Sequence, residues 1–298
     1  MDTREALLVD AFTTEPMAGN PAGVVPDADG LTDGQMQAIA AELGASETAF
    51  VRSAEGEADR ALRFFSPTQE VELCGHATVA AHAALTERGL APGDSLVRTR
   101  VGDLAVTVED DGRVWLEAEE PELRRLEVPL ADVANALGID VAALEDVGAD
   151  LPLSRGSAGT PFVLVPVNFL EHLSDASPDP AGIEAVAEEA GAIGIYAFTF
   201  DTLSGESTWH ARCFAPGAGI PEDPVTGTGA AACGAFVRRH GAVDVDAALR
   251  AEQGHFVDRP GLVDVRVDDR VAVGGRAVTV LDGDLVVPSR ESDDIIEA

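Results

Sequence analysis

Few residue types in this sequence could carry out chemistry at neutral pH. Asp and Glu together number 53, and the 20 basic residues are all arginines. A pyridoxal-phosphate enzyme needs a lysine for its Schiff base, and a P-loop nucleotide site needs a lysine beside its phosphates. The sequence excludes both classes, and no Gly-x-Gly-x-x-Gly motif follows a predicted strand. An enzyme built from this chain is expected to work with its side chains and no cofactor.

Cysteine and histidine give no sign of a metal centre. The three cysteines are an odd number at irregular spacing, which fits neither a disulfide framework nor a Cys-x-x-Cys metal site. Five histidines lack the spacing of metal ligands and are expected to be structural: His82, His172, His210, His240 and His255. No metal site is predicted, and the cysteine usage is typical of a reducing cytosol.

Two glycines stand where an anion could bind. Gly75 and Gly227 precede segments 76–88 and 228–240, whose first turns are small and apolar almost all round. A helix without a polar face is buried, and its N-terminus presents unpaired backbone N–H groups that attract anions. The alternative is that these glycines only make tight turns into packed helices. Because the feature is repeated, we favour a carboxylate site formed by two helix ends across a cleft.

Other segments recur in the same order as the two glycines. Gly19-Asn20-Pro21 resembles Gly159-Thr160-Pro161. Arg63, Phe65 and Pro67 recur as Arg212, Phe214 and Pro216. Ordered matches of this kind indicate an ancient duplication and therefore two similar domains.

The duplication and the short apolar segments together predict an α+β fold. Strands are expected at residues 104–108, 114–117, 162–167 and 263–267, and a loop with an outer helix at 170–190. A mixed sheet or barrel curled around one buried helix in each half satisfies these features, giving two pseudo-symmetric domains. We place the first domain at residues 1–118 plus about 282–298 and the second at 119–281. The active site is expected in the cleft between them.

Three polar residues are candidates for the chemistry. Glu47 precedes an apolar stretch, where most glutamates are solvated strand ends, but the second half has Ile195 at the corresponding position. An acid present in one repeat only favours a functional role over a role in symmetric packing. His76 and Asp223 each have a structural alternative, as a helix cap and as a cap or turn residue, beside a role in the site.

Several motifs, taken together, resemble those of one enzyme family. They are Val9-Asp10-Ala11-Phe12, Ala18-Gly19-Asn20-Pro21-Ala22, Ser46-Glu47-Thr48-Ala49-Phe50, Phe65-Ser66-Pro67, Glu72-Leu73-Cys74-Gly75-His76-Ala77-Thr78 and Glu222-Asp223-Pro224-Val225-Thr226-Gly227-Thr228. In this order they span both halves and resemble the PhzF-like isomerases of phenazine biosynthesis. The resemblance implies the fold of diaminopimelate epimerase, a site between two pseudo-symmetric domains, no cofactor and usually a homodimer.

The resemblance also implies roles for individual residues. Glu47 is then the base that shuttles a proton during isomerisation, and His76 and Asp223 line the site. Thr228 stands where the family has a serine, so it keeps the hydroxyl donor and adds a methyl group. Gly75 and Gly227 are the substrate-binding helix ends.

Cys74 requires a separate interpretation. Diaminopimelate epimerase uses two thiols, one from each half, each followed by glycine. Cys74-Gly75 fits the first, and a helix N-terminus would lower a thiol pKa. The second position is Thr226, which cannot serve as such a base, so the two-thiol mechanism is excluded. Cys74 is expected to be a small residue in the wall of the site.

The charge of the chain is extreme, with a formal net of -33. The acids are scattered along the chain, so they are expected to cover the surface, where their repulsion is tolerable only when salt screens it. We therefore predict a protein adapted to high salt. A calcium buffer is disfavoured because no Asp-x-Asp-x-Asp-Gly loop occurs, which leaves an acidic chaperone as the alternative. Nucleic acid is an unsuitable partner for this surface.

The expected cellular compartment is inferred from two kinds of segment that the sequence lacks. No apolar run approaches the ~20 residues that a membrane helix needs, and the first residues lack the pattern of a signal peptide. We expect a cytoplasmic protein.

Three functions are compatible with these residues. The first is an isomerase that moves a proton on a small carboxylate-bearing substrate. The second is a one-base amino-acid racemase or epimerase on the same scaffold, which would invert a stereocentre instead of shifting a double bond. The third is a catalytically silent protein that binds a small molecule and exchanges no protons. The isomerase is the preferred interpretation, and the motifs do not identify its substrate.

Overall fold

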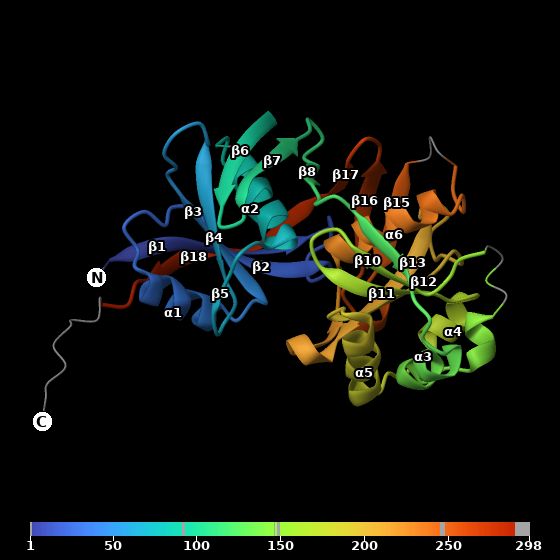
Figure 1. Ribbon diagram of the computed structural model, residues 1–298. Helices are drawn as coiled ribbons and strands as arrows, with labels where there is room; N and C mark the ends of the chain where they lie inside the picture. Colours follow the sequence, from blue (N-terminus) through green and yellow to red (C-terminus); the bar gives the residue numbers. More distant parts are fainter. Residues whose placement is uncertain (1, 91–92, 146, 148–149, 245–247, 290–298) are drawn as a thin grey trace, which may run out of the picture. The chain divides into compact units, whose positions relative to one another are not determined.

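The computed structural model describes residues 2–90, 93–145, 147, 150–244 and 248–289. The chain forms two compact units (Figure 1). The first contains residues 1–17, 21–115 and the chain from Arg276 onward, and the second contains residues 18–20 and 116–275. Apart from residues 18–20, the second unit is one continuous stretch that begins after Trp115 and ends at Gly275. Residues 290–298, which the sequence analysis placed in the first domain, lie outside the described residues.

The first unit consists mainly of strands. Its helices are α1 (Asp33–Leu43) and α2 (Gly75–Glu87), and its strands are β1 (Thr3–Ala11), β2 (Asn20–Val25), β3 (Glu47–Arg52), β4 (Arg60–Phe65), β5 (Glu70–Val71), β6 (Gly93–Thr99), β7 (Gly102–Val108) and β18 (Ala277–Val286). β8 (Val114–Glu117) begins in this unit and ends in the second. β18 pairs antiparallel with β1, from Thr3 opposite Val286 to Ala11 opposite Ala277. The end of the chain thereby completes the unit that the beginning of the chain starts.

The second unit repeats this composition with additional short helices. Its helices are α3 (Leu130–Leu137), α4 (Leu170–Ser174), α5 (Pro180–Ala190) and α6 (Gly227–Arg239), with 3-10 turns η1 (Val141–Leu144), η2 (Pro216–Ala218) and η3 (His255–Val257). Its strands are β9 (Glu122–Arg125), β10 (Ser154–Ser157), β11 (Pro161–Pro166), β12 (Gly194–Thr199), β13 (Trp209–Ala215), β14 (Ile220–Asp223), β15 (Leu249–Gln253), β16 (Gly261–Val267) and β17 (Val271–Gly275).

The strand directions in the two units follow the same scheme. In the first unit β2 pairs parallel with β3, β3 antiparallel with β4, and β4 parallel with β6. In the second, β11 pairs parallel with β12, β12 antiparallel with β13, and β13 parallel with β15. The predicted α+β fold of two pseudo-symmetric halves is confirmed.

One buried helix occupies the centre of each unit. α2 contacts β1, β3, β7 and β18, and α6 contacts β10, β11, β16 and β17. Figure 1 shows each of them lying among the strands of its own unit. Nine consecutive residues are buried in each helix, from Ala77 to Leu85 in α2 and from Gly229 to Val237 in α6. Because most of these side chains are small, strands can approach the helix from several sides, as the sequence predicts.

The repeated arginine has the same structural role in both units. Arg63 donates two hydrogen bonds to Glu70, at 2.7 and 2.8 Å, and its guanidinium lies over the ring of Phe65. Arg212 donates two to Glu222, at 2.9 and 2.7 Å, and lies over Phe214. A bidentate pair of this kind fixes both partners geometrically. Each pair therefore ties the short strand that precedes the buried helix to the strand before it.

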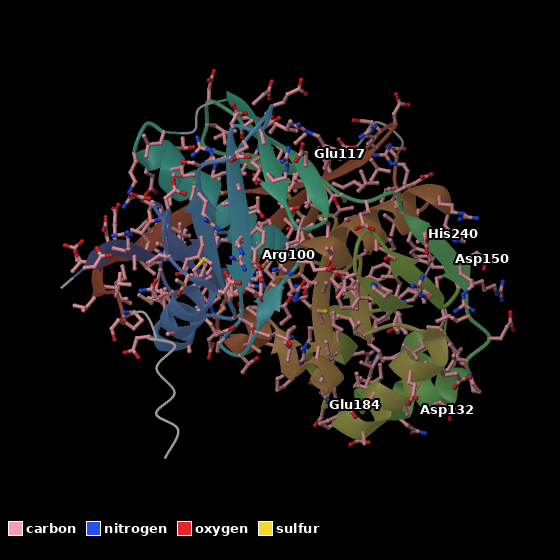
Figure 2. The ribbon with its side chains drawn as sticks, turned by 60° about the vertical axis from the view of Figure 1, so that its left-hand side comes forward. Arg100, Glu117, Asp132, Asp150, Glu184 and His240 are labelled. Carbon is pink, nitrogen blue, oxygen red and sulfur yellow. The ribbon has the colours of Figure 1, made fainter. Side chains whose placement is uncertain are left out.

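Acidic side chains cover the surfaces of both units. Asp132, Asp150 and Glu184 are exposed, and Figure 2 shows their side chains directed away from the ribbon. Most acids of the described residues are thus at least partly exposed, as the sequence predicts, and Asp10 and Glu252 are buried exceptions. No helix in the described part of the chain has both the length and the apolar character needed to span a bilayer.

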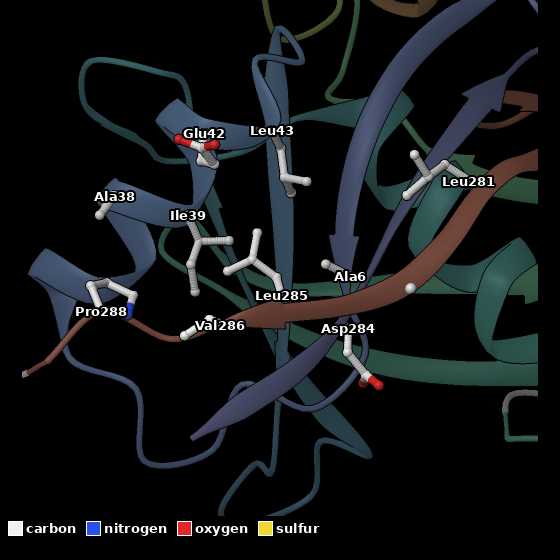
Figure 3. Close-up of a pocket in the computed structure, with 11 residues that line it drawn as sticks. Ala6, Ala38, Ile39, Glu42, Leu43, Leu281, Asp284, Leu285, Val286 and Pro288 are labelled. Carbon is white, nitrogen blue, oxygen red and sulfur yellow. The ribbon is translucent and has the colours of Figure 1, made fainter. Parts of the chain in front are cut away.

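A pocket opens on the surface of the first unit between α1 and β18 (Figure 3). Its lining is largely apolar and includes Ile39, Leu43 and Leu285. None of the residues that the sequence nominates for chemistry lines it. The candidate site therefore lies elsewhere in the chain.

Candidate active site

Three side chains with reactive groups meet in the first unit. Glu47 is the first residue of β3, Cys74 is the N-cap of α2, and His76 is the second residue of α2. Glu47 Oε2 lies 3.3 Å from His76 Nε2. Cys74 Sγ lies 3.8 Å from Glu47 Oε2 and 3.4 Å from His76 Nδ1. The structure thus brings two of the predicted catalytic residues into contact and adds the thiol, which the sequence assigned only to the wall.

Local structure explains why these residues converge. β3 lies between β2 and β4, and its interior residues from Thr48 to Val51 are buried, which leaves Glu47 at the partly exposed end of the strand. On α2, the hydroxyl of Thr78 donates to the carbonyl of Cys74 at 2.7 Å, and the Thr78 amide donates to the same carbonyl at 3.0 Å. These bonds close the first helical turn and hold Cys74 and His76 at its start.

The environment of His76 favours the neutral imidazole. Its side chain is 12% exposed, and that of Glu47 is 20% exposed. Burial lowers the pKa of His76 below its ordinary value, and the negative charge of Glu47 offsets this only in part. Ser46 Oγ lies 3.2 Å from His76 Nε2. A neutral ring at this position can donate one hydrogen bond and accept another, so it can orient a substrate or relay a proton.

Gly75, the predicted substrate-binding glycine, is the first residue of α2. The Cys74 side chain makes no capping hydrogen bond to this helix end. The first turn therefore presents backbone N–H groups that a side-chain cap would otherwise satisfy, directly beside His76. This arrangement suits the binding of a carboxylate or another anion.

The second unit contains a separate polar network around Asp223, at the end of β14. Asn20 Nδ2 donates to Asp223 Oδ1 at 2.9 Å, and the hydroxyl of Thr226 donates to Oδ2 at 2.6 Å. Gln253 Nε2 donates to the carbonyl of Asp223 at 2.8 Å and to Thr226 Oγ1 at 3.0 Å. Each carboxylate oxygen of Asp223 has a donor, so its orientation is fixed. The sequence nominated Asp223 but gave no role to Asn20 or Gln253, although Asn20 stands in a quoted motif.

Gly227 and Thr228 are the first two residues of α6. Thr228 is partly buried, and its methyl carbon would touch a Cβ placed at Gly159, at 3.7 Å. Gly159 has a φ of 113°, a backbone conformation that favours glycine. The extra methyl group of Thr228 is thus accommodated beside a residue that has no side chain.

The strand registers correct one detail of the internal repeat. Ala22 lies opposite Glu47 and Phe65 opposite Thr48 in the first unit. Their counterparts Phe162 and Phe214 lie opposite Gly194 and Ile195. The residue equivalent to Glu47 is therefore Gly194, and the assignment of Ile195 was wrong by one residue.

The corrected register strengthens the contrast between the halves. A Cβ at Gly194 would overlap the carbonyl oxygen of Phe214 and lie 3.0 Å from the Cα of Ala215. The second unit therefore has no room for any side chain at this position, let alone an acid. The acid belongs to one half only.

The contact between Glu47, Cys74 and His76 also bears on metal binding. One oxygen, one sulfur and one nitrogen from these residues lie within 4.8 Å of one another, a group that could hold a metal ion. The sequence predicted no metal ligands, because its cysteines and the five histidines other than His76 do not have metal-ligand spacing. Only the packing of β3 against α2 brings Glu47, Cys74 and His76 together.

The whole chain, and not only this site, has known counterparts. The sequence model of the family described as "Phenazine biosynthesis-like protein" matches residues 9–283. This chain belongs to the phenazine biosynthesis-like family. The match spans both units and every candidate residue, which confirms the resemblance drawn from the motifs.

Relatives of this family member carry isomerase names. The "Uncharacterized isomerase YfhB" of Bacillus subtilis is 37% identical over 275 residues, covering 90% of this chain and 92% of that protein. Trans-2,3-dihydro-3-hydroxyanthranilate isomerase of Pseudomonas chlororaphis is 29% identical over 293 residues, covering 94% and 99%. This chain is an isomerase.

Solved structures agree with this family assignment. The Bacillus anthracis phenazine biosynthesis protein of the PhzF family superposes with a TM-score of 0.88 at 33% identity, covering 96% of this chain and all of that one. A hydroxyproline epimerase from Agrobacterium vitis gives a TM-score of 0.56 at 13% identity, covering 96% and 91%. The likeness to the epimerase shows that the two proteins share a fold.

Proposed function

We propose that this family member isomerises a small carboxylate-bearing substrate by moving a proton from one carbon to another, with Glu47 as base and then acid. The observation that carries the proposal is the contact of the Glu47 carboxylate with the His76 ring at the start of α2. A carboxylate in a partly enclosed position can take a proton from carbon when nearby groups stabilise the anion that forms.

The proposed reaction needs no oxidant and no second substrate. Glu47 removes a proton from one carbon of the substrate, and the electron pair of that C–H bond enters the neighbouring π system. The double bond shifts, and the now protonated Glu47 returns the proton to another carbon. Product and substrate therefore have the same atoms and the same oxidation level.

The remaining residues stabilise and orient the substrate in this proposal. The backbone N–H groups at Gly75 and Gly227 bind the carboxylate, which is useful in a chain that has no lysine. His76, as a neutral ring, donates a hydrogen bond to the developing anion or passes the proton. Asp223, held by Asn20 and Thr226, fixes a polar group of the substrate. The Thr228 hydroxyl, at the start of α6, is a further donor in this proposal.

The names of relatives support the class of substrate but do not identify it. The Pseudomonas chlororaphis relative acts, by its name, on trans-2,3-dihydro-3-hydroxyanthranilate, which carries a carboxylate. Because the identity is 29%, we carry over to this chain only two features, a substrate with a carboxylate and a reaction that shifts a proton. We further propose a homodimer, because the motif resemblance implies dimers and β18 exposes Leu281 and Val286. We also propose that the protein is cytoplasmic, from the cysteine usage of the sequence.

The test is the substitution Glu47→Gln, which keeps the shape and removes the base. General acid–base groups contribute about 10²–10⁴-fold to a rate, so turnover should fall by about that factor while substrate affinity stays near that of the wild type. The measurement is product formation in deuterated water, with label incorporation read by mass spectrometry. A shifted double bond identifies an isomerase, and an inverted stereocentre identifies an epimerase.

The matched control is Glu57→Gln, because Glu57 is exposed in the loop between β3 and β4. It removes one acid from the same unit and should leave turnover unchanged. Full activity of Glu47→Gln, with activity abolished in a His76→Asn variant, would show that the base is not Glu47.

A further inference from the structure

The cluster of Glu47, Cys74 and His76 joins three chemically different donors in one place. The carboxylate supplies oxygen, the thiol supplies sulfur, and the imidazole supplies nitrogen. A proton-transfer site needs the carboxylate and the imidazole. The proposed reaction gives the thiol no role. Cys74 is nevertheless held within 3.8 Å of both partners.

We propose that Glu47, Cys74 and His76 bind a thiophilic divalent cation such as Zn²⁺, and that the bound ion blocks the isomerase. The binding follows from the geometry of the three donors. Only the inhibition rests on the proposed function, because an ion bound to Glu47 occupies the carboxylate that would act as the base.

The distances between the donors suit a tetrahedral ion. Zn²⁺ lies ~2.0–2.1 Å from histidine nitrogen, ~2.0–2.2 Å from carboxylate oxygen and ~2.3 Å from thiolate sulfur, so tetrahedral ligands are about 3.3–3.6 Å apart. Here Glu47 Oε2 and His76 Nε2 are 3.3 Å apart, and Cys74 Sγ is 3.8 Å from each of these atoms. Because Cys74 Sγ also lies 3.4 Å from His76 Nδ1, it sits beside the imidazole, and the ring has to turn before the Nε2 lone pair can reach an ion shared with the sulfur. After that rotation the three donors occupy three corners of the tetrahedron. The fourth corner is left for water or for a substrate group.

The ligand types select among metals. A thiolate with an imidazole prefers Zn²⁺ and similar ions, whereas Mg²⁺ and Ca²⁺ prefer sites made of oxygen alone. The many surface carboxylates of this chain are oxygen-only ligands, so they do not compete well for a thiophilic ion. Ser46 Oγ, which contacts His76 Nε2, also lies 3.3 Å from the carbonyl of Pro21 and can keep that acceptor when the metal takes the nitrogen.

The charge balance of the proposed site is favourable. Cys74 binds as a thiolate, so its proton leaves to solvent, while Glu47 binds as a carboxylate and His76 as the neutral ring. Two negative charges then meet one doubly charged cation, and the partly buried site carries no net charge. Binding should therefore release about one proton per ion and become tighter as pH rises.

The experiment titrates the folded protein with Co²⁺ and with Zn²⁺ at molar salt and in excess Mg²⁺, which occupies oxygen-only sites. Co²⁺ should produce the sulfur-to-metal charge-transfer absorption of a thiolate ligand, and Zn²⁺ should displace it with one ion per chain. Calorimetry in two buffers of different ionisation enthalpy should show the released proton.

The decisive variant is Cys74→Ser, with Cys233→Ala as the matched control. Cys233 is a buried cysteine within α6, and burial raises the pKa of its thiol well above the ordinary value. Cys74→Ser should abolish the charge-transfer band and weaken Zn²⁺ binding by more than the about 10–100-fold that loss of an outer hydrogen-bond partner costs. Cys233→Ala should retain both. A band that survives in Cys74→Ser, or the lack of a band in the folded wild type, overturns the site.

The outcomes separate the two proposals. Stoichiometric binding of Zn²⁺ to a protein without isomerase activity would leave the metal site standing and remove the proposed function. An active enzyme that depends on Glu47 and is unaffected by Zn²⁺ would leave the proposed function standing and remove the inhibitory metal site. If both proposals hold, Zn²⁺ inhibits the wild type reversibly, a chelator restores it, and Cys74→Ser is less sensitive.

Discussion

The contrast between Glu47 and Gly194 shows how a duplicated chain acquires an asymmetric residue. Both residues lie at the start of a strand and at the same point of the strand register, yet one carries a carboxylate and the other has no side chain. In the second unit the backbone of β13 approaches this point closely, so that the Phe214 carbonyl lies where a Cβ would have to be. Packing in that half therefore requires glycine.

This close approach predicts a cost for the smallest possible side chain. Gly194→Ala forces the new methyl group against the Phe214 carbonyl, and relief requires a shift of backbone. Overpacking of this kind costs typically about 1–3 kcal/mol, so the denaturant midpoint should fall at an unchanged slope.

The control for this prediction is Gly34→Ala in α1, where nothing lies within 4 Å of the new Cβ. Gly34 is the second residue of α1, in the first turn, so alanine should gain less than the about 0.8–1.0 kcal/mol that it gains over glycine in a helix interior. This variant should therefore be neutral or slightly more stable. Equal stability of Gly194→Ala and the wild type would mean that β12 and β13 can separate without cost.

At the scale of elements, a buried histidine–glutamate pair joins strands β13 and β15. His210 Nδ1 lies 2.9 Å from Glu252 Oε1, and both side chains are at most 1% exposed. Glu252 also accepts hydrogen bonds from the amides of Leu203 and Ser204, at 2.5 and 3.2 Å. One carboxylate therefore fastens the loop between β12 and β13 to the neighbouring strand.

These contacts make the stability of the second unit depend on pH. Burial alone would raise the pKa of Glu252, but hydrogen bonds from His210 and from the Leu203 amide outweigh it and lower the pKa from 4.5 to about 2. A lowered folded-state pKa means that the stabilisation is fully present above about pH 4.5 and is lost as pH falls toward about 2. The wild type should lose stability across this window.

The variant Glu252→Gln isolates this contribution from the other carboxylates. It should be less stable than the wild type near neutral pH, and the difference should shrink as pH falls from about 4.5 toward about 2. Denaturant unfolding at a series of pH values measures it. A difference that stays constant across this window would show that the charge of Glu252 does not contribute.

At the scale of the whole molecule, the dominant feature is the net charge of -33. Exposed acids such as Asp132 and Glu184 lie on a surface with few basic residues to offset them. Repulsion among them opposes the compact state, and salt reduces it because the Debye length falls from ~10 Å at 0.1 M to ~3 Å at 1 M.

We expect the fold to loosen when the protein is dialysed into low salt and to recover in molar salt. Circular dichroism and sedimentation, measured against salt concentration, report secondary structure and compactness together. The same sedimentation data show whether the proposed dimer persists. Unchanged stability down to tens of millimolar salt would contradict the adaptation to high salt.

Composition and local pattern were enough to predict several features of this protein. The lack of lysine excluded two enzyme classes, and the small apolar residues after Gly75 and Gly227 predicted two buried helices. The ordered motifs identified the duplication and the family. The roles of Glu47, His76 and Asp223 remain predictions from those motifs, although the structure places the first two in contact.

Which distant side chains meet depends on how the elements pack. Asn20 and Asp223 are 203 residues apart along the chain and share a hydrogen bond. Cys74 joins Glu47 and His76 only because α2 packs against β3. The equivalence of Glu47 with Gly194 depends on strand register, where a slip of one residue turns every side chain to the other face. Local periodicity records which face of an element is buried but not what lies opposite it, because long-range pairing sets that partner.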